Sequence, residues 1–187
     1  MHVRLIFYSV LTALLLLGCS KQQESKTATP NIPPAIENVA EVVSVEKREN
    51  RAPNFSWKDQ SDHTMNLDTF RGKATLVNFW ATWCGPCKRE LPDLVALHTE
   101  LASHGIKIVG ISTDRGSNAV DDVRSFVRDH GIQYQIVIAS EELEEAFGNV
   151  RLLPTSFILD ADGNIVQTII GPRSKAFFSE ALLAVAK

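Results

Sequence analysis

Cysteine is scarce in this sequence: only Cys19, Cys84 and Cys87 are present among 187 residues. A structural zinc site needs four ligands, and no His lies within six residues of the pair formed by Cys84 and Cys87. A c-type haem needs a His directly after the second Cys, and that residue is Lys88. The ligand count therefore argues against zinc, and the missing His excludes a c-type haem. An inert disulfide and a redox-active dithiol remain as interpretations.

The sequence also has no surplus of positive charge. It holds 19 Lys and Arg against 22 Asp and Glu, for a net charge of -3. Proteins that bind nucleic acid usually carry a basic surplus, so we expect no nucleic-acid partner. The hydrophobic share of 44% and the charged share of 22% are ordinary for a globular domain with a real core.

The first apolar run, residues 5–17, falls short of the ~20 residues that span a bilayer. It follows a single basic residue, Arg4, and has the length of a signal-peptide core. The run ends in LLGC at residues 16–19, which resembles a bacterial lipobox, in which the Cys is diacylated and becomes the mature N-terminus. We expect residues 1–19 to be a lipoprotein signal peptide with Cys19 as the lipidation site. An uncleaved N-terminal anchor is the alternative, and both interpretations export the domain.

Residues 20–52 show no sustained apolar periodicity. The segment KQQESKTATPNIPP is polar and contains three Pro, so it cannot bury enough surface to offset chain entropy. We therefore expect residues 20–52 to form a flexible tether. Residues 36–46 are more apolar, and they fit either an edge strand or a short helix.

The most informative stretch is TLVNFWATWCGPCKRELP at residues 75–92. Its apolar first half predicts a buried strand, and its second half places Cys84 and Cys87 at the start of a helix. The positive end of a helix stabilises a thiolate, so Cys84 should be the reactive sulfur and Cys87 the sulfur that resolves a mixed disulfide. Pro86 fits the first helical turn, where a missing N–H leaves no helical bond unmade. Gly85 keeps the approach to Cys84 open.

These residues carry a specific family resemblance. WCGPCK resembles the active site of thioredoxin, and LVNFWATWCGPCKRELP is similar to the membrane-anchored thioredoxin-like oxidoreductases of the TlpA and ResA kind. The resemblance covers about residues 53–187, which we expect to form the thioredoxin-like domain. It implies a thiol-disulfide oxidoreductase that works through its cysteines and needs no bound cofactor or metal.

The pattern after residue 53 predicts an α/β fold with a mixed central sheet flanked by helices. A hairpin is expected around DQSDH, followed by strands at residues 75–80, 106–112 and 134–139, and a second hairpin around residues 161–163. This order resembles the thioredoxin fold. The helix and strand within residues 118–139 resemble the central insertion that separates the TlpA and ResA kind from plain thioredoxin.

The resemblance also assigns roles around the dithiol. Pro154 matches the cis-proline of this fold, and Leu153 before it would offer backbone groups to a substrate, although base rates alone favour a trans bond. Apart from the resemblance, the large aromatic side chain of Trp83 is expected to lie at the surface near the sulfurs rather than to take part in the chemistry. Glu90, one turn beyond Cys87, matches the active-site acid of ResA. Asn78 occupies the position of thioredoxin's buried Asp, and its amide cannot carry the proton that leaves Cys87. A solvated charge is the alternative interpretation of Glu90.

The sequence therefore predicts an exported, lipid-anchored monomer on the periplasmic side of a membrane, inner or outer, that reduces disulfides in envelope proteins. By family, apocytochromes c and copper-site proteins are candidate substrates, and a membrane thiol carrier is the expected electron donor. Two alternatives remain. A thiol peroxidase would use the same fold, but the chain lacks the lone peroxidatic Cys that peroxiredoxins carry outside a CxxC. A copper carrier would bind the metal through the dithiol, but copper proteins of the Sco kind have a wider Cys spacing and a His.

Overall fold

The computed structural model describes residues 38–49 and 51–186. Its elements are the following: β1 (Val39–Glu46), β2 (Asn54–Lys58), β3 (Thr64–Asn66), the 3-10 helix η2 (Leu67–Phe70), β4 (Thr75–Trp80), α1 (Gly85–Leu101), the 3-10 helix η3 (Ala102–His104), β5 (Lys107–Ser112), α2 (Ala119–Asp129), β6 (Gln135–Ile138), α3 (Glu141–Ala146), β7 (Thr155–Leu159), β8 (Ile165–Ile170) and α4 (Lys175–Val185). The predicted hairpins, central strands and helices are present.

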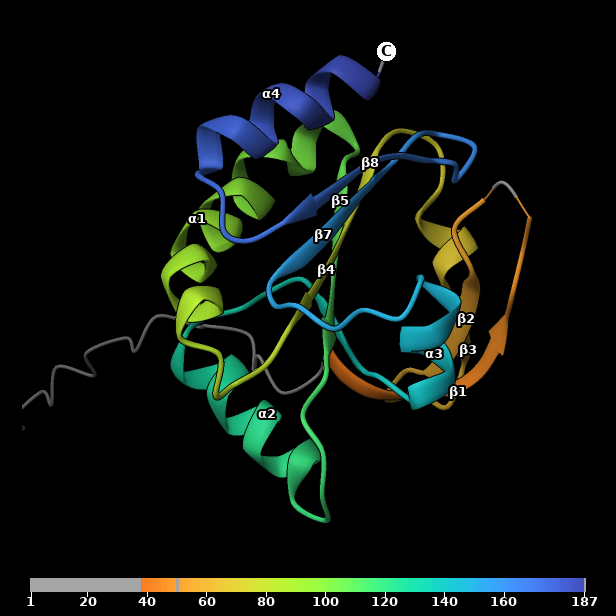
Figure 1. Ribbon diagram of the computed structural model, residues 1–187, viewed down its shortest axis with the longest axis vertical. Coiled ribbons are helices and arrows are strands. Elements are labelled where there is room, and N and C mark those ends of the chain that lie inside the picture. The colour runs from red at the N-terminus through yellow and green to blue at the C-terminus, as the bar shows by residue number, and fades with distance from the viewer. Residues whose placement is uncertain (1–37, 50, 187) are drawn as a thin grey trace, which may run out of the picture. The chain divides into compact units, whose positions relative to one another are not determined.

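The strands form one mixed sheet in the order β3-β2-β1-β6-β5-β4-β7-β8 (Figure 1). β4, β5 and β6 run parallel, whereas β7 is antiparallel to β4 and β8 is antiparallel to β7. All six residues of β4 are buried, as expected for a central strand that is covered on both faces. The predicted mixed sheet is confirmed.

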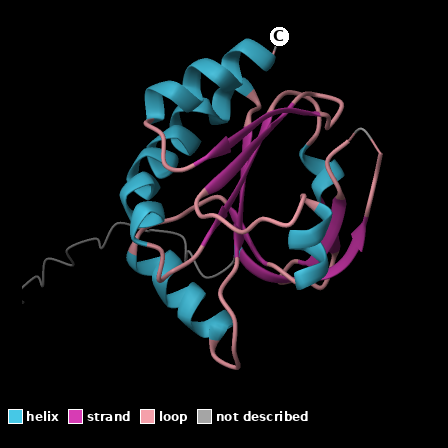
Figure 2. Cartoon of the chain, in the orientation of Figure 1, coloured by secondary structure: helices cyan, strands magenta, loops and turns pink. Residues whose placement is uncertain are grey.

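Two hydrophobic clusters occupy the two faces of the sheet. On one face, Leu76 and Ile108 belong to the cluster that includes residues of α1, α2 and α4; on the other, Val77 and Phe79 pack with β2 and α3. Figure 2 shows the same division, with α1, α2 and α4 on one side of the strands and α3 on the other. Alternate residues of a strand point to opposite faces, so a single apolar run supplies both clusters.

The structure corrects the expected start of the domain. The tether was expected to extend through residue 52, yet Val39–Glu46 is a strand within the sheet. Val39, Ala40 and Glu41 pair in parallel with β6, and the later part of β1 pairs antiparallel with β2. The choice left open for residues 36–46 is thus resolved as a strand from Val39 onward. The strand was hard to predict because only Val39 in it is fully buried.

Other expectations for the N-terminus concern residues outside the described part of the chain. The signal peptide of residues 1–19, lipidation of Cys19 and the tether up to residue 37 all lie there. Among the residues that are described, no helix is both long enough and apolar enough to traverse a bilayer.

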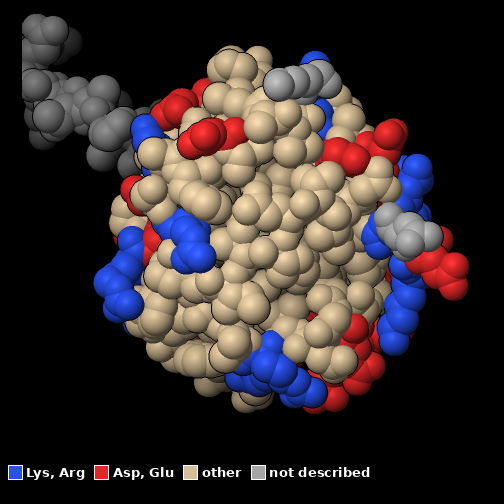
Figure 3. All heavy atoms as spheres, turned by 45° about the horizontal axis from the view of Figure 1, so that its top comes forward, with Lys and Arg blue, Asp and Glu red and all other residues tan. Residues whose placement is uncertain are grey.

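Charged side chains lie around the rim of the face shown in Figure 3, and its middle shows neither acidic nor basic side chains. β8, at one edge of the sheet, contains no charged residue, and its Val166 and Ile170 are largely exposed.

Candidate active site

A sharp corner joins β4 to α1 and carries the two cysteines. Cys84 is the N-cap residue of α1, and its backbone N–H donates to the carbonyl of Ala81 at 3.1 Å. Residues 81–84 therefore form a β-turn between strand and helix. The structure thus confirms the prediction that a strand leads into a helix with the two cysteines at its N-terminus.

The two sulfurs of Cys84 and Cys87 are joined in a disulfide, with an S–S distance of 2.06 Å. Sγ of Cys84 accepts a hydrogen bond from the backbone N–H of Cys87 at 3.2 Å, so it occupies the place that a Ser or Asp oxygen usually takes in an N-cap. Cys84 is 4% exposed and Cys87 is 5% exposed, so exposure does not show which sulfur attacks and which resolves. Only Cys84 has the N-cap position, which favours an anion on that sulfur.

The two residues between the cysteines match the expected geometry. Pro86 lies in the first turn of α1, where its missing N–H costs no helical bond. A Cβ built on Gly85 would meet only the Arg89 side chain, at 3.9 Å, so the chain itself leaves this position open. Trp83, directly before Cys84, is 68% exposed and offers a large apolar surface beside the sulfurs.

Glu90 lies one helical turn after Cys87 and is buried beneath the helix. Its side chain is 3% exposed, which contradicts the alternative of a solvated charge. One carboxylate oxygen accepts from the backbone N–H of Arg173 at 2.8 Å, and the other accepts from Nδ2 of Asn78 at 3.2 Å. Burial raises the pKa of the Glu90 carboxyl, and these two hydrogen bonds partly oppose that rise.

Asn78 connects the acid to the strand that follows the proline loop. Asn78 on β4 is paired with Ser156 on β7, and its Nδ2 donates to Oγ of Ser156 at 2.9 Å as well as to Glu90. The backbone N–H of Arg173 and the hydroxyl of Ser156 are parts of the site that the sequence reasoning missed. Neither belongs to a motif, and only the pairing of distant segments brings them to Glu90.

The peptide bond between Leu153 and Pro154 is cis. The family resemblance implied this, whereas the low frequency of cis X-Pro bonds in folded proteins favoured trans. β7 begins directly afterwards, and Thr155 pairs with Phe79, so Pro154 lies at the same edge of the sheet as the end of β4. Leu153 is partly buried and Leu152 is 60% exposed. The proline loop and Trp83 thus place apolar side chains at the edge that carries the cysteines.

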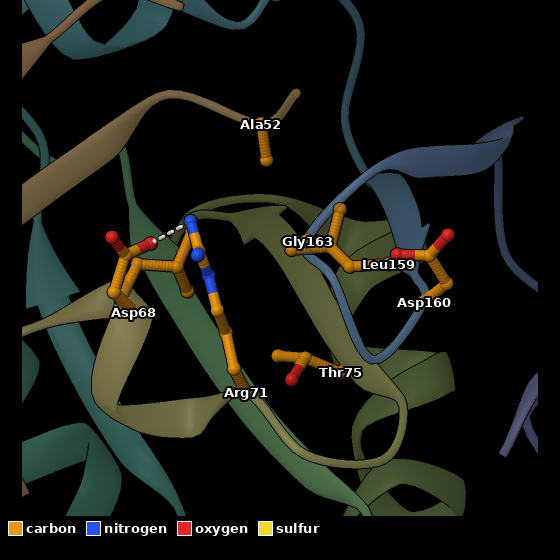
Figure 4. Close-up of a pocket in the computed structure, with 8 residues that line it drawn as sticks. Ala52, Asp68, Arg71, Thr75, Leu159, Asp160 and Gly163 are labelled. Atoms are coloured by element: carbon orange, nitrogen blue, oxygen red, sulfur yellow. Dashed lines mark ion pairs between the residues drawn. The ribbon is translucent and has the colours of Figure 1, made fainter. Parts of the chain in front are cut away.

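A small pocket elsewhere in the molecule is a weaker candidate. It lies between η2, the start of β4 and the β7–β8 turn, where Asp68 forms an ion pair with Arg71 at 2.6 Å (Figure 4). Its volume of about 10 Å³ matches a single water molecule. The pocket adjoins Thr75 at the start of β4, opposite the end that leads to Cys84, so it is not part of the dithiol site.

Comparisons with known proteins agree with this geometry. The AhpC/TSA family matches residues 49–168, more than half of the chain. The thiol-disulfide oxidoreductase ResA of Bacillus thuringiensis (strain Al Hakam) is 34% identical over 124 residues, which cover 66% of this chain and 70% of that protein.

Two crystal structures share the fold. A thiol:disulfide interchange protein of the thioredoxin family from Chlorobium tepidum TLS is 36% identical with a TM-score of 0.66, covering 76% of this chain and 99% of that one. StoA from Bacillus subtilis is 26% identical with a TM-score of 0.60, covering 71% and 98%. The expected thioredoxin fold is confirmed, and the chain belongs to the AhpC/TSA family as a thiol-disulfide oxidoreductase similar to ResA.

Proposed function

We propose that this protein reduces disulfides in exported proteins, with Cys84 as the attacking sulfur and Cys87 as the resolving one. The observation that carries the proposal is the N-cap position of Cys84, whose sulfur accepts from the Cys87 N–H. A sulfur held at the positive end of a helix becomes a thiolate more readily than one inside the first turn.

The reaction proceeds in two exchanges. The Cys84 thiolate attacks one sulfur of the substrate disulfide, which forms a mixed disulfide and releases one substrate thiolate. The thiol of Cys87 then loses its proton, and its thiolate attacks the Cys84 sulfur. This step breaks the mixed disulfide, forms the Cys84–Cys87 bond and releases the second substrate thiolate. Two electrons pass from the dithiol to the substrate.

Glu90 is proposed as the group that takes the proton from Cys87. Burial raises the pKa of the Glu90 carboxyl, which makes its carboxylate a stronger proton acceptor than an exposed one, and residues three apart on a helix share a face. Asn78 hydrogen-bonds to Glu90 but cannot itself accept that proton.

We propose that the substrate binds across Trp83, Gly85, Pro86, Leu153 and Pro154. The exposed Trp83 and the partly buried Leu153 give an apolar surface, and the loop before β7 offers backbone groups to an extended segment. Candidate substrates are apocytochromes c and copper-site proteins of the cell envelope.

We further propose that the domain is held on the periplasmic side of a membrane by a lipid on Cys19, and that a membrane thiol carrier returns electrons to the dithiol. The LLGC ending of the apolar run supports the anchor. Replacement of Cys19 by Ala should release the protein from the membrane fraction after cell lysis. Retention of the Ala variant in the membrane to the same extent would rule the lipid out.

A trapping experiment tests the reaction itself. The Cys87→Ser variant should accumulate mixed disulfides through Cys84, because the resolving sulfur is absent. The matched Cys84→Ser variant should trap far less. Captured proteins, identified after release with a reductant, should be exported and contain cysteine. Equal trapping by the two variants would refute the assignment of the attacking sulfur.

A further inference from the structure

Asp114 is a buried carboxylate beside the dithiol corner. It follows β5 by two residues, and β5 runs parallel to β4, so Asp114 and the segment after Trp80 lie at the same edge of the sheet. Its side chain is 6% exposed. A carboxylate in such a place requires hydrogen-bond donors to offset the loss of water.

Neutral donors surround this carboxylate. Thr82 donates its backbone N–H at 2.9 Å and its hydroxyl at 2.5 Å, one to each oxygen, and the Ser112 hydroxyl donates at 2.8 Å. Across residues 38–49 and 51–186, no Lys, Arg or His side chain forms an ion pair with Asp114. The neighbouring Arg115 instead donates to the carbonyl of Ala139 and pairs with Glu144. The negative charge of Asp114 is therefore held without a cation bound to it.

Thr82 links this carboxylate to the reactive sulfur. It is a central residue of the turn in which the Cys84 N–H donates to the Ala81 carbonyl. A second link holds the start of the corner, since the Thr113 N–H donates to the Trp80 carbonyl at 2.8 Å. The end of β5 thus fixes the corner on which Cys84 sits.

We propose that Asp114 is a positioning residue for thiol–disulfide exchange. It fixes the position of Cys84 through Thr82, and its charge shifts the equilibrium between the Cys84–Cys87 dithiol and disulfide toward the disulfide. This inference rests on the proposed role of Cys84 as the attacking sulfur. The compact turn keeps the carboxylate within about 10 Å of that sulfur. At an effective dielectric constant of about 20, a charge at that distance disfavours the thiolate by roughly tenfold.

The charge is tested by Asp114→Asn in equilibrium with glutathione, in which the dithiol and oxidised glutathione give the disulfide and two reduced glutathione molecules. At a pH where Cys84 is ionised in the reduced form, the equilibrium constant should fall about tenfold, which makes the couple about 30 mV less reducing. Alkylation of Cys84 in the Cys87→Ser background should also shift to lower pH. The control Asp121→Asn removes an exposed carboxylate and should change neither quantity. An Asp114→Asn equilibrium constant equal to that of the wild type would overturn the electrostatic role.

The positioning role is tested by substitutions at Thr82. This test does not depend on whether Asp114→Asn folds. Thr82→Val removes the hydroxyl donor but keeps the backbone N–H and the charge of Asp114. We expect reduction of oxidised glutathione to slow by at least about threefold while the equilibrium constant stays unchanged. Thr82→Ser keeps both donors and should behave as the wild type. Equal rates for the Val and Ser variants would overturn the positioning role.

The same measurements separate this inference from the proposed function. If Cys87 rather than Cys84 is alkylated first in the wild-type dithiol, the proposed assignment of the attacking sulfur fails. If Cys84 is alkylated first and the Asp114 and Thr82 variants match the wild type, only the inference about Asp114 fails.

Discussion

At the scale of single residues, the two cysteines differ in position more than in exposure. The sulfur of Cys84 accepts a helix N–H, whereas Cys87 supplies that N–H from within the first turn. A thiolate at the N-cap gains roughly 0.3–2 kcal/mol from the helix terminus, and a second negative charge beside it is disfavoured. The two thiols should therefore differ in the pH at which they become reactive.

We predict that Cys84 is alkylated at lower pH than a free thiol and that Cys87 is not. The measurement is the rate of alkylation against pH of the remaining cysteine of the pair, Cys84 in Cys87→Ser and Cys87 in Cys84→Ser. Superimposable pH profiles for the two variants would contradict the prediction.

The proposed role of Glu90 as a proton acceptor predicts a loss of activity when its carboxylate is replaced by an amide. Glu90→Gln should slow disulfide exchange by about 10²-fold, the lower end of what a general acid or base contributes. The exposed carboxylate of Glu100 lies on the same helix and pairs with Lys175, so Glu100→Gln is the matched control and should leave the rate unchanged. Wild-type exchange rates in Glu90→Gln would remove Glu90 from the mechanism.

The same substitution tests the burial of the acid through the pH dependence of unfolding. Because burial raises the pKa of Glu90 above 4.5 in the folded state, the folded protein holds this proton more tightly than the unfolded chain. The resulting stabilisation is complete below pH 4.5 and is lost as the pH rises through the folded pKa. The free energy of unfolding of Glu90→Gln should lack this decline, which parallel denaturant titrations across this pH range would measure.

The site residues differ in how far the sequence could predict them. Cys84, Cys87 and Pro86 lie within one short motif, so local chemistry identified them. The burial of Glu90 could not be read from the flanking Lys88 and Arg89, because it depends on Asn78 and on the loop before α4. Asp114 had no motif at all, since its role depends on the parallel pairing of β4 and β5.

At the scale of elements, periodicity predicted the helices and central strands because each carries an uninterrupted apolar pattern. β1 has no such apolar pattern, since seven of its eight residues are partly or fully exposed. A strand with so little buried surface depends on its partners β2 and β6 rather than on its own composition. The polar, Pro-containing residues before it made a tether the natural expectation for the whole segment.

We predict that β1 is required for the stability of the domain. A protein that begins at Asn38 should unfold at the same denaturant concentration as the full chain, whereas one that begins at Pro53 should be less stable by at least about 2 kcal/mol. Loss of β1 removes the buried Val39 and takes from β2 and β6 one of the two strands that each pairs with. Equal unfolding midpoints for the two shortened proteins would show that β1 is dispensable.

At the scale of the whole molecule, the remaining question is the direction of electron flow. Strong oxidants of this fold carry a His between the cysteines, which stabilises the thiolate and thereby the reduced form. This chain has Gly85 and Pro86 there, and neither side chain offers a charge or a hydrogen-bond donor. We predict that the protein reduces its partners rather than oxidising them.

The size of the expected effect makes this prediction decisive. A thioredoxin-like couple and a DsbA-like couple differ by about 150 mV, or about 7 kcal/mol for two electrons. That difference exceeds what exposed charges on the surface contribute, since single exposed pairs give about 1 kcal/mol or less. Equilibration with glutathione buffers should give a potential near the thioredoxin value. A potential near that of DsbA would make the protein an oxidase, and the proposed supply of electrons from a membrane thiol carrier would then have no role.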